Sequence, residues 1–319
     1  MNKRSPTRGK LTLIKGVNPR ASKATKVKHV LNVVKKRYKD PIWLHKEISR
    51  DILEVYYKKI KGNDGIYVLE EKWDNLIILD ACRYDVLKEV LGKDIDYRIS
   101  RGSTTSEWLR ENFPDEKYDD IVYITANPWV SKRAASSFHK LIPLWRDRWD
   151  EELGTVHPRT TTEVTLEAAK KYPGKRLIAH YLQPHAPYIV ENEITTKENY
   201  CEASTEPREF IRLLERGKLS PTLVRDVYKR SLEATLPYVY ELIEGLTGRT
   251  VITADHGELF GKKLMFYNFA GHPWGVRVPE LIQVPWVVFE SGVKLPGGKS
   301  SEQQELKDVI SRLKHEGHI

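Results

Sequence analysis

A buried strand that ends in polar side chains is predicted by the stretch Thr250-Val251-Ile252-Thr253-Ala254-Asp255-His256-Gly257-Glu258. Its first five residues are small or β-branched, which is typical of a strand covered on both faces. In open α/β sheets, functional sites lie just beyond the carboxyl ends of the strands. An adjacent carboxylate and imidazole at such an end suit a divalent metal ion. Asp255 and His256 are equally typical of a polar turn, so other parts of the chain must supply further partners.

A second stretch repeats the pattern of a buried strand followed by a carboxylate. Residues 76–79 are four consecutive aliphatic side chains, and Asp80 follows them. Residues 81–91 then predict a helix, with Arg83 near its start. Asp80 is therefore a second candidate for a metal ligand at the end of a strand.

A run of hydroxyl side chains, residues 103–106, stands at the start of a predicted helix. Thr104 and Glu107 have the spacing of a capping box, which marks a helix N-terminus. Backbone N–H groups and the helix dipole favour an anion there, so a hydroxyl in this run suits a nucleophile toward a phosphate or sulfate ester. The alternative is that all four hydroxyls serve only to cap and turn the chain.

Two histidines are predicted to lie in loops. A strand over residues 175–182 runs into a proline-rich loop that holds His185, and His272 lies in a second loop over residues 271–275. A single loop histidine is more often structural than catalytic, so neither assigns a function alone.

The charge of the chain is unevenly distributed. The sequence has 53 basic and 44 acidic side chains and a net charge of +9. Residues 1–39 contain 13 Lys or Arg and no Asp or Glu, so the remainder is mildly acidic. This basic arm is expected to contact membrane headgroups or nucleic acid. Residues 26–39 within it predict a basic amphipathic helix, which suits a membrane interface or packing on the protein body.

The apolar content of the chain predicts a cytoplasmic location. If the basic arm binds a membrane, the protein would be peripheral at that membrane. No run reaches the roughly 18 apolar residues of a membrane span. The early apolar run at residues 11–14 is shorter than the ~7–15 residues of a signal-peptide core. Two cysteines, Cys82 and Cys201, provide neither a disulfide framework nor metal-type spacing. The sequence does not define the oligomeric state.

Four segments are expected along the chain. They are the basic arm (1–39), a helical lead-in (40–72), a catalytic domain (73–290) and a C-terminal helix (291–319). Further strands are predicted at 97–100, 120–125 and 284–289, and further helices at 42–61, 160–172, 207–216 and 221–246. Residues 129–158 have no clear pattern, and residues 191–206 suit a lid over the site.

The order of these motifs resembles the sulfatase-like branch of the alkaline phosphatase superfamily, over residues 73–290. The resemblance implies an α/β fold with a mostly parallel central sheet and helices on both faces. It implies that Asp80, Asp255 and His256 bind metal, because the family's Asp-His-Gly-Glu segment stands intact at 255–258. The family's His-x-Pro-Tyr segment matches residues 185–188, which implies that His185 contacts the substrate.

The resemblance also implies that a hydroxyl at the helix start is both nucleophile and metal ligand. Thr105 fits that position best, and Ser103 is the second choice. The negative charge of the ester is expected to be stabilised by three side chains, those of His185, His272 and Arg83. The implied cofactor is one divalent ion, with Mn²⁺ or Zn²⁺ favoured over Mg²⁺ or Ca²⁺.

Departures from the family narrow the expected reaction. No Cys/Ser-x-Pro/Ala-x-Arg segment surrounds Thr105, which disfavours a true sulfatase. No Asp lies between His180 and His185, which favours one metal over two. The chain most resembles the threonine-nucleophile, metal-dependent members. The expected activity is hydrolysis or transfer of phosphomonoesters or phosphodiesters on an anionic ester substrate. A sulfate-ester hydrolase remains an alternative, as does a non-catalytic scaffold with a vestigial site, docked by its basic arm.

Overall fold

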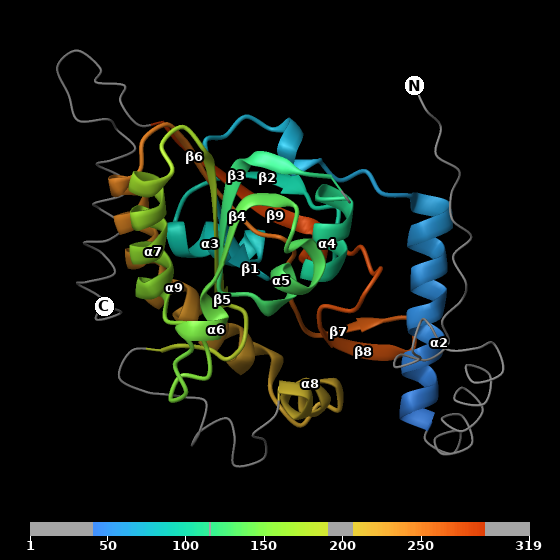
Figure 1. The fold of residues 1–319 in the computed structure, drawn as a ribbon. Coiled ribbons are helices and arrows are strands. Elements are labelled where there is room, and N and C mark those ends of the chain that lie inside the picture. The colour runs from blue at the N-terminus through green and yellow to red at the C-terminus, as the bar shows by residue number, and fades with distance from the viewer. Residues whose placement is uncertain (1–40, 115, 191–206, 291–319) are drawn as a thin grey trace.

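The computed structural model of the protein describes residues 41–114, 116–190 and 207–290. A seven-stranded sheet forms its centre, with strand order β2-β9-β6-β1-β5-β3-β4 (Figure 1). The strands are β1 (Asn75–Asp80), β2 (Asp96–Ile99), β3 (Tyr118–Thr125), β4 (Phe138–Pro143), β5 (Arg176–Pro184), β6 (Arg249–Thr253) and β9 (Gln283–Glu290). The strands from β6 to β4 run parallel, whereas β9 pairs antiparallel with β6 and with β2. The predicted mostly parallel sheet is confirmed.

Strand β1 lies between β5 and β6 and is buried along its whole length. Its run of aliphatic side chains therefore packs on both faces of the sheet, as the sequence predicted. The register pairs Ile78 with His180 on one side and with Thr253 on the other. The carboxyl ends of the three strands consequently meet at one edge, and this edge holds the polar clusters.

Helices cover both faces of the sheet, which confirms the expected layering. One face is packed by α3 (Tyr84–Leu91), α7 (Pro158–Lys171) and α9 (Pro221–Gly245), and the other by α4 (Thr105–Asn112) and α5 (Pro128–Ala134). Figure 1 shows α7 and α9 to the left of the sheet and α4 and α5 to its right. The shorter or peripheral elements are α2 (Pro41–Val55), η1 (Tyr56–Lys61), η2 (Val68–Glu70), α6 (Leu144–Asp147), α8 (Pro207–Glu215) and α10 (Pro279–Ile282).

In two regions the structure contains strands that were not predicted from the sequence. The unassigned residues 129–158 contain α5, α6 and the edge strand β4, in which only Phe138 is buried. An edge strand with few buried side chains lacks the alternation that identifies a strand. The hairpin of β7 (Leu259–Leu264) and β8 (Tyr267–Gly271) was also not predicted, because its glycine and lysines mask the apolar side chains that it buries.

Helix boundaries followed the predictions closely. The helix expected over 42–61 is α2 continued by the π-helical turn η1, which ends at Gly62 with a φ of 75°. The α3 helix begins at Tyr84 rather than Ala81, because Ala81 has a left-handed φ of 59° and residues 81–83 form a turn. The α9 helix continues through Pro237.

Several predicted segments lie outside the described residues. These are the basic arm with its amphipathic helix at 26–39, the lid at 191–206 and the C-terminal helix in 291–319. Within the described ranges, no helix combines the length and the apolar character that a bilayer crossing requires.

Candidate metal centre

The carboxyl ends of β1, β5 and β6 bring four polar side chains together. Asp80 ends β1, His180 lies in β5, and Asp255 and His256 follow β6. All four side chains are buried beneath the surface. Residues separated by 175 positions in sequence thus share one site because their strands are neighbours.

Three of these residues form a group that suits a cation. One ligand atom each from Asp80, His180 and Asp255 lie within 4.8 Å of one another. Asp80 Oδ1, Asp255 Oδ2 and His180 Nε2 are buried and have no hydrogen-bond partner among the described residues. Buried polar atoms without partners are costly, and a coordinated cation would satisfy all three. The donor set of carboxylate oxygens and imidazole nitrogen fits Zn²⁺ or Mn²⁺.

His256 presents its second ring nitrogen to the same group. Its Nδ1 lies 2.8 Å from the carbonyl oxygen of Gly257, and a carbonyl accepts only. In the neutral ring Nδ1 therefore carries the proton, and Nε2 offers a lone pair. Nε2 lies 3.4 Å from Asp255 Oδ2 and 3.7 Å from Asp80 Oδ1. His256 is thus poised as a further ligand.

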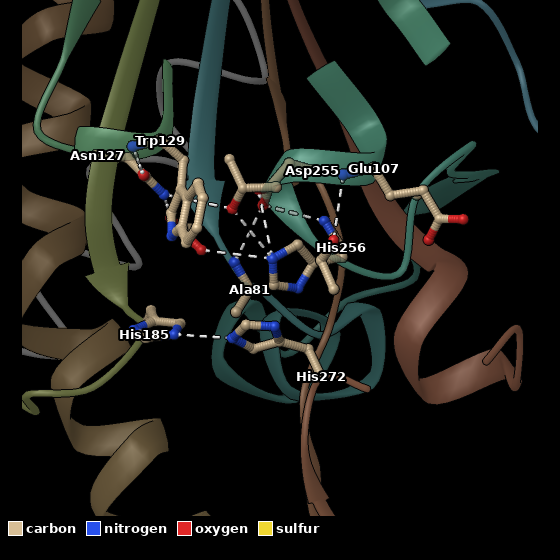
Figure 2. Close-up of polar contacts among 12 residues, drawn as sticks. Ala81, Glu107, Asn127, Trp129, His185, Asp255, His256 and His272 are labelled. Atoms are coloured by element: carbon tan, nitrogen blue, oxygen red, sulfur yellow. Dashed lines mark hydrogen bonds and ion pairs between the residues drawn. The ribbon is translucent and has the colours of Figure 1, made fainter. Parts of the chain in front are cut away.

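The charge state of Asp80 also suits a metal ligand. Burial alone would raise its pKa, but the neighbouring imidazoles of His180, His185 and His256 hold its pKa well below the usual 3.8. Asp255 is held by two backbone N–H groups, because its Oδ1 accepts from Ala81 at 3.2 Å and from His256 at 3.0 Å. This leaves the other oxygen of Asp255 directed at the group (Figure 2).

Thr105 is the first residue of α4 and lies beside this group. Its hydroxyl oxygen is 3.3 Å from His256 Nε2. Thr104 caps the helix, because its hydroxyl accepts from the Glu107 N–H at 3.1 Å, as the spacing predicted. The capping by Thr104 leaves the hydroxyl of Thr105 available at the helix N-terminus.

Ser103 is placed differently. Its hydroxyl contacts Glu107 Oε2 at 2.9 Å and the carbonyl oxygen of Pro273 at 3.0 Å, and it accepts from the Gly275 N–H at 3.0 Å. The Glu107 carboxylate also accepts from the Ser103 N–H at 3.0 Å, instead of returning to Thr104 as in a full capping box. None of these partners belongs to the ligand group, so Ser103 joins α4 to the loop after His272.

Two residues of this centre were missed by sequence reasoning. Asn127, just after β3, donates its side-chain N–H to Asp80 Oδ2 and to Thr105 Oγ1, the latter at 3.3 Å. Its position after a predicted strand was the available signal. His180 was considered only in weighing one metal against two and was not predicted as a ligand, but its Nδ1 lies 2.9 Å from the hydroxyl of Tyr123 and its Nε2 lies 3.5 Å from Asp80 Oδ2.

A second group of ligand atoms lies next to the first. His185, Glu258 and His272 also place one ligand atom each within 4.8 Å of one another. His185 Nε2 faces His272 Nε2 at 3.0 Å (Figure 2). The ring of His272 in turn lies 4.5 Å, centroid to centroid, from that of His256. The structure therefore brings both predicted loop histidines to the same edge as the metal ligands.

The titrating groups of this second set influence each other. Burial would lower the pKa of His185, but the Asp80 and Glu258 carboxylates outweigh it and raise that pKa. Burial raises the pKa of Glu258 to about 7, although the charges of His185 and His256 oppose the shift. A cation between these groups would relieve the burial of the Glu258 carboxylate.

Arg83 lies at the margin of the centre. Its guanidinium forms an ion pair with Asp85 at 2.8 Å and donates to the carbonyl oxygen of Glu258 at 3.2 Å. It also stacks over the ring of Phe260. These contacts give Arg83 a structural role in joining α3 to the start of β7.

The similarities found between this chain and known proteins are distant. No family model matches it, and no curated protein matches it. Among solved structures it is similar to the C-terminal periplasmic domain of phosphoethanolamine transferase EptC from Campylobacter jejuni, with a TM-score of 0.44 and 15% identity over 75% of this chain and 88% of that one.

Two further structures are similar at the same level. One is the integral membrane protein lipooligosaccharide phosphoethanolamine transferase A from Neisseria meningitidis, with a TM-score of 0.43 and 14% identity over 89% of this chain and 64% of that one. The other is a zinc complex of the C-terminal periplasmic domain of EptC from Escherichia coli, with a TM-score of 0.39 and 11% identity over 79% and 84%. A function for this chain must therefore be inferred from its own residues.

The expected cytoplasmic location is contradicted by these comparisons. Two of the similar structures are described as periplasmic domains and the third as an integral membrane protein. The prediction depended on the absence of a long apolar run, which is a weak guide to the compartment in which a domain works.

Proposed function

We propose that this protein is a metal-dependent enzyme that cleaves or transfers phosphate esters, with Thr105 as the nucleophile. The observation that carries the proposal is the position of the Thr105 hydroxyl, 3.3 Å from His256 Nε2 and beside buried ligand atoms that lack hydrogen-bond partners within the described part of the chain. A hydroxyl that served only to cap the helix would not need to lie beside His256 and the buried ligand atoms. Thr104 already performs the capping.

The residues that would hold the cation are those of the buried group. Asp80, Asp255 and His256 supply charged and neutral donors, Thr105 supplies its hydroxyl oxygen, and His180 adds a nitrogen. A divalent ion bound there supplies Lewis-acid chemistry, which lowers the pKa of a hydroxyl and neutralises charge on an ester oxygen. The low pKa of Asp80 keeps that ligand ionised at neutral pH.

The chain's own groups account for the proposed steps. The Thr105 hydroxyl gives up its proton to water as its oxygen attacks phosphorus, the bond from phosphorus to the leaving alcohol breaks, and the phosphoryl group becomes attached to Thr105. Asn127 holds the attacking oxygen through its side-chain N–H. The positive end of the α4 helix dipole, at Thr105, favours the anionic ester. Water or an acceptor alcohol then attacks phosphorus and releases Thr105.

His185 and His272 are placed to act on the leaving oxygen of the ester. Their Nε2 atoms face each other at 3.0 Å, and both rings are only half buried, so a ligand can reach them. A protonated imidazole there donates a proton to the leaving oxygen. The raised pKa of His185 supports a protonated ring near neutral pH.

A second cation is favoured by a specific observation. The ligand atoms of His185, Glu258 and His272 lie within 4.8 Å, and the burial of Glu258 disfavours its charged form unless a positive partner is present. This group is less buried than the first, so we propose that it binds an ion more weakly. With an ion present, the two histidines would hold it instead of donating a proton.

Two alternatives compete with this proposal. A sulfate ester shares the anionic, tetrahedral form of a phosphate ester, and a non-catalytic scaffold would retain the fold without the chemistry. The proposed test is hydrolysis of p-nitrophenyl phosphate, bis-p-nitrophenyl phosphate and p-nitrophenyl sulfate by metal-stripped protein, with Mn²⁺, Zn²⁺ or Mg²⁺ restored.

Metal-dependent turnover of a phosphate ester that is lost in Thr105→Ala and retained in Ser103→Ala would support the proposal. Turnover of the sulfate alone would favour a sulfatase. Protein that binds no metal and turns over none of the three esters would favour the scaffold.

A further inference from the structure

The outer face of α2 and η1 carries an apolar ridge that is exposed. Leu44, Ile48, Ile52, Tyr56 and Ile60 recur at every fourth residue, and their exposed fractions run from 41% to 74%. Side chains four apart lie on one face of a helix. These five residues, called here the α2 ridge, therefore form a continuous apolar strip along the helix.

This ridge is distinct from the face that anchors the helix to the protein. Leu53 and Tyr57 pack with the β7–β8 hairpin and with Val276 in a separate apolar cluster. Figure 1 shows α2 at the edge of the molecule, beyond that hairpin and away from the central sheet. An amphipathic surface helix normally carries polar side chains opposite its buried face. A second, exposed apolar face thus calls for a binding partner.

The tip of the β7–β8 hairpin extends the same apolar surface. Met265 and Phe266 are exposed by 46% and 60%. The tip stays against α2, because the Phe266 N–H donates to Ser49 Oγ at 3.2 Å and the Phe266 ring lies 6.4 Å from that of His45. A bulky aromatic side chain therefore projects beside the N-terminal half of the ridge.

The charges around the ridge are predominantly basic. Lys58, Lys59 and Lys61 follow one another in the last turn of η1. The acidic Glu47 and Asp51 are only 15% exposed and pair with Arg50, and Glu54 is 29% exposed and pairs with Lys58 at 3.8 Å. Upstream of α2, residues 1–39 contain 13 basic and no acidic side chains. An apolar strip bordered by lysines is the composition of a helix that lies in a lipid interface.

We propose that the α2 ridge and the tip of the β7–β8 hairpin dock this protein on an anionic lipid surface. The apolar side chains would enter the headgroup region while the lysines contact lipid phosphates. Anionic lipid is favoured over a second copy of the chain because the end of the ridge carries three lysines, Lys58, Lys59 and Lys61, with Glu54 as the acidic partner of Lys58, and this local excess of positive charge matches lipid phosphates.

Docking in this way would also orient the candidate metal centre. The hairpin that carries Phe266 at its tip has Glu258 and His272 at its base. Each strand of the hairpin has five or six residues, so the base lies about 20 Å from the tip at roughly 3.4 Å per residue. The inference does not depend on the proposed chemistry, since it concerns only where the protein binds.

The test is co-sedimentation of the full-length chain with vesicles of phosphatidylcholine alone and of phosphatidylcholine mixed with phosphatidylglycerol. We expect binding to the anionic vesicles only, weakened by salt. Replacement of two ridge residues, Ile48→Asn with Ile52→Asn, is expected to weaken binding by roughly tenfold or more, because it removes two apolar contacts. Both side chains are exposed, so the fold should survive, and thermal unfolding checks this.

A matched pair of tyrosine variants separates the ridge from apolar surface in general. Tyr56 is 44% exposed and Tyr97, on the edge strand β2, is 47% exposed, and each contacts one other tyrosine ring. Tyr56→Ser should weaken vesicle binding, and Tyr97→Ser should not. Equal effects of the two variants, or full binding by the Ile48/Ile52 variant, would overturn the proposal.

Sedimentation velocity without lipid distinguishes a lipid partner from a second copy of the chain. A monomer under these conditions, for the wild type and the Ile48/Ile52 variant, agrees with a lipid partner. A wild-type dimer that becomes monomeric in the variant would show that the ridge binds a second copy. Protection of α2 from hydrogen exchange in the lipid-free monomer that falls when residues 1–39 are deleted would show that the chain's own basic segment covers the ridge. Either of these two results would also overturn the proposal.

Discussion

The side-chain nitrogen of Asn127 lies 3.3 Å from the hydroxyl oxygen of Thr105. The same nitrogen donates to Asp80, so one amide links the proposed nucleophile to a proposed metal ligand. The Asn127 side-chain oxygen is held by the backbone N–H of Trp129 at 2.8 Å, which fixes the orientation of the amide.

Replacing Asn127 should therefore impair the reaction without removing the nucleophile. We expect Asn127→Ala to lower kcat or metal affinity by about 10- to 100-fold, as is usual when a partner of a metal ligand is lost. Steady-state kinetics on the preferred nitrophenyl ester, with metal titrated, will separate the two effects. Asn63→Ala, at an exposed turn remote in sequence, serves as the control. Unchanged kinetics in Asn127→Ala would remove this residue from the mechanism.

Metal content should show two classes of binding. Asp255→Asn is expected to abolish the tighter class, because it removes the charge of a buried ligand whose Oδ2 has no protein hydrogen bond. His272→Ala should remove the weaker class and leave the tighter one. Equilibrium dialysis with Zn²⁺, followed by elemental analysis, measures both. A single class that survives His272→Ala unchanged would limit the centre to one ion.

The ion pairs between α3 and α9 should make stability depend on pH. Hydrogen bonds from Arg225 and Lys229 lower the pKa of Glu89 below its usual 4.5. Because the folded pKa is the lower one, this stabilisation is complete above pH 4.5 and is lost as the pH falls through the folded pKa. Glu89 is partly exposed, so Glu89→Gln should cost about 0.5–1 kcal/mol at neutral pH.

Urea unfolding at neutral pH and near pH 3 measures this difference, which should shrink in acid because Glu89 of the unfolded chain, with the higher pKa, takes up its proton first. Glu70→Gln, at an exposed position in η2, is the control. A difference between wild type and Glu89→Gln that persists undiminished in acid would contradict the assignment.

Gly257 allows the turn that carries Asp255 and His256 to approach α10 closely. A Cβ at this position would lie 2.0 Å from the carbonyl oxygen of Glu280, and the Gly257 N–H donates to Leu281 at 2.9 Å. Gly257→Ala should therefore displace His256 and lower the free energy of unfolding by about 1–3 kcal/mol. Gly245→Ala should cost far less, because its added methyl group meets only the flexible end of Leu166. Denaturant unfolding compares the two, and equal losses would show that the close approach is not the cause.

The sequence was sufficient to predict the central strands because they carry unbroken apolar runs. The β1 and β6 strands are buried on both faces, and each is followed by a carboxylate that the structure places in the centre. Strand β4 was missed because only Phe138 in it is buried, and the β7–β8 hairpin was missed because a glycine and two lysines interrupt its apolar pattern.

The missed site residues have a similar explanation. His180 lies inside a strand, where a histidine is usually structural, and only the pairing of β5 with β1 shows that it reaches Asp80. Asn127 follows β3, which is separated from β1 by β5, so no local spacing connects it with Thr105. Tertiary contacts of this kind depend on strand order, which the sequence pattern does not define.

The most direct measurement of the central claim is mass spectrometry of the protein after rapid acid quench during turnover of a phosphate ester. If Thr105 is the nucleophile, a phosphoryl group will be found on Thr105, present with metal and absent in Thr105→Ala. Phosphate on Ser103, or steady turnover by Thr105→Ala equal to that of the wild type, would contradict it.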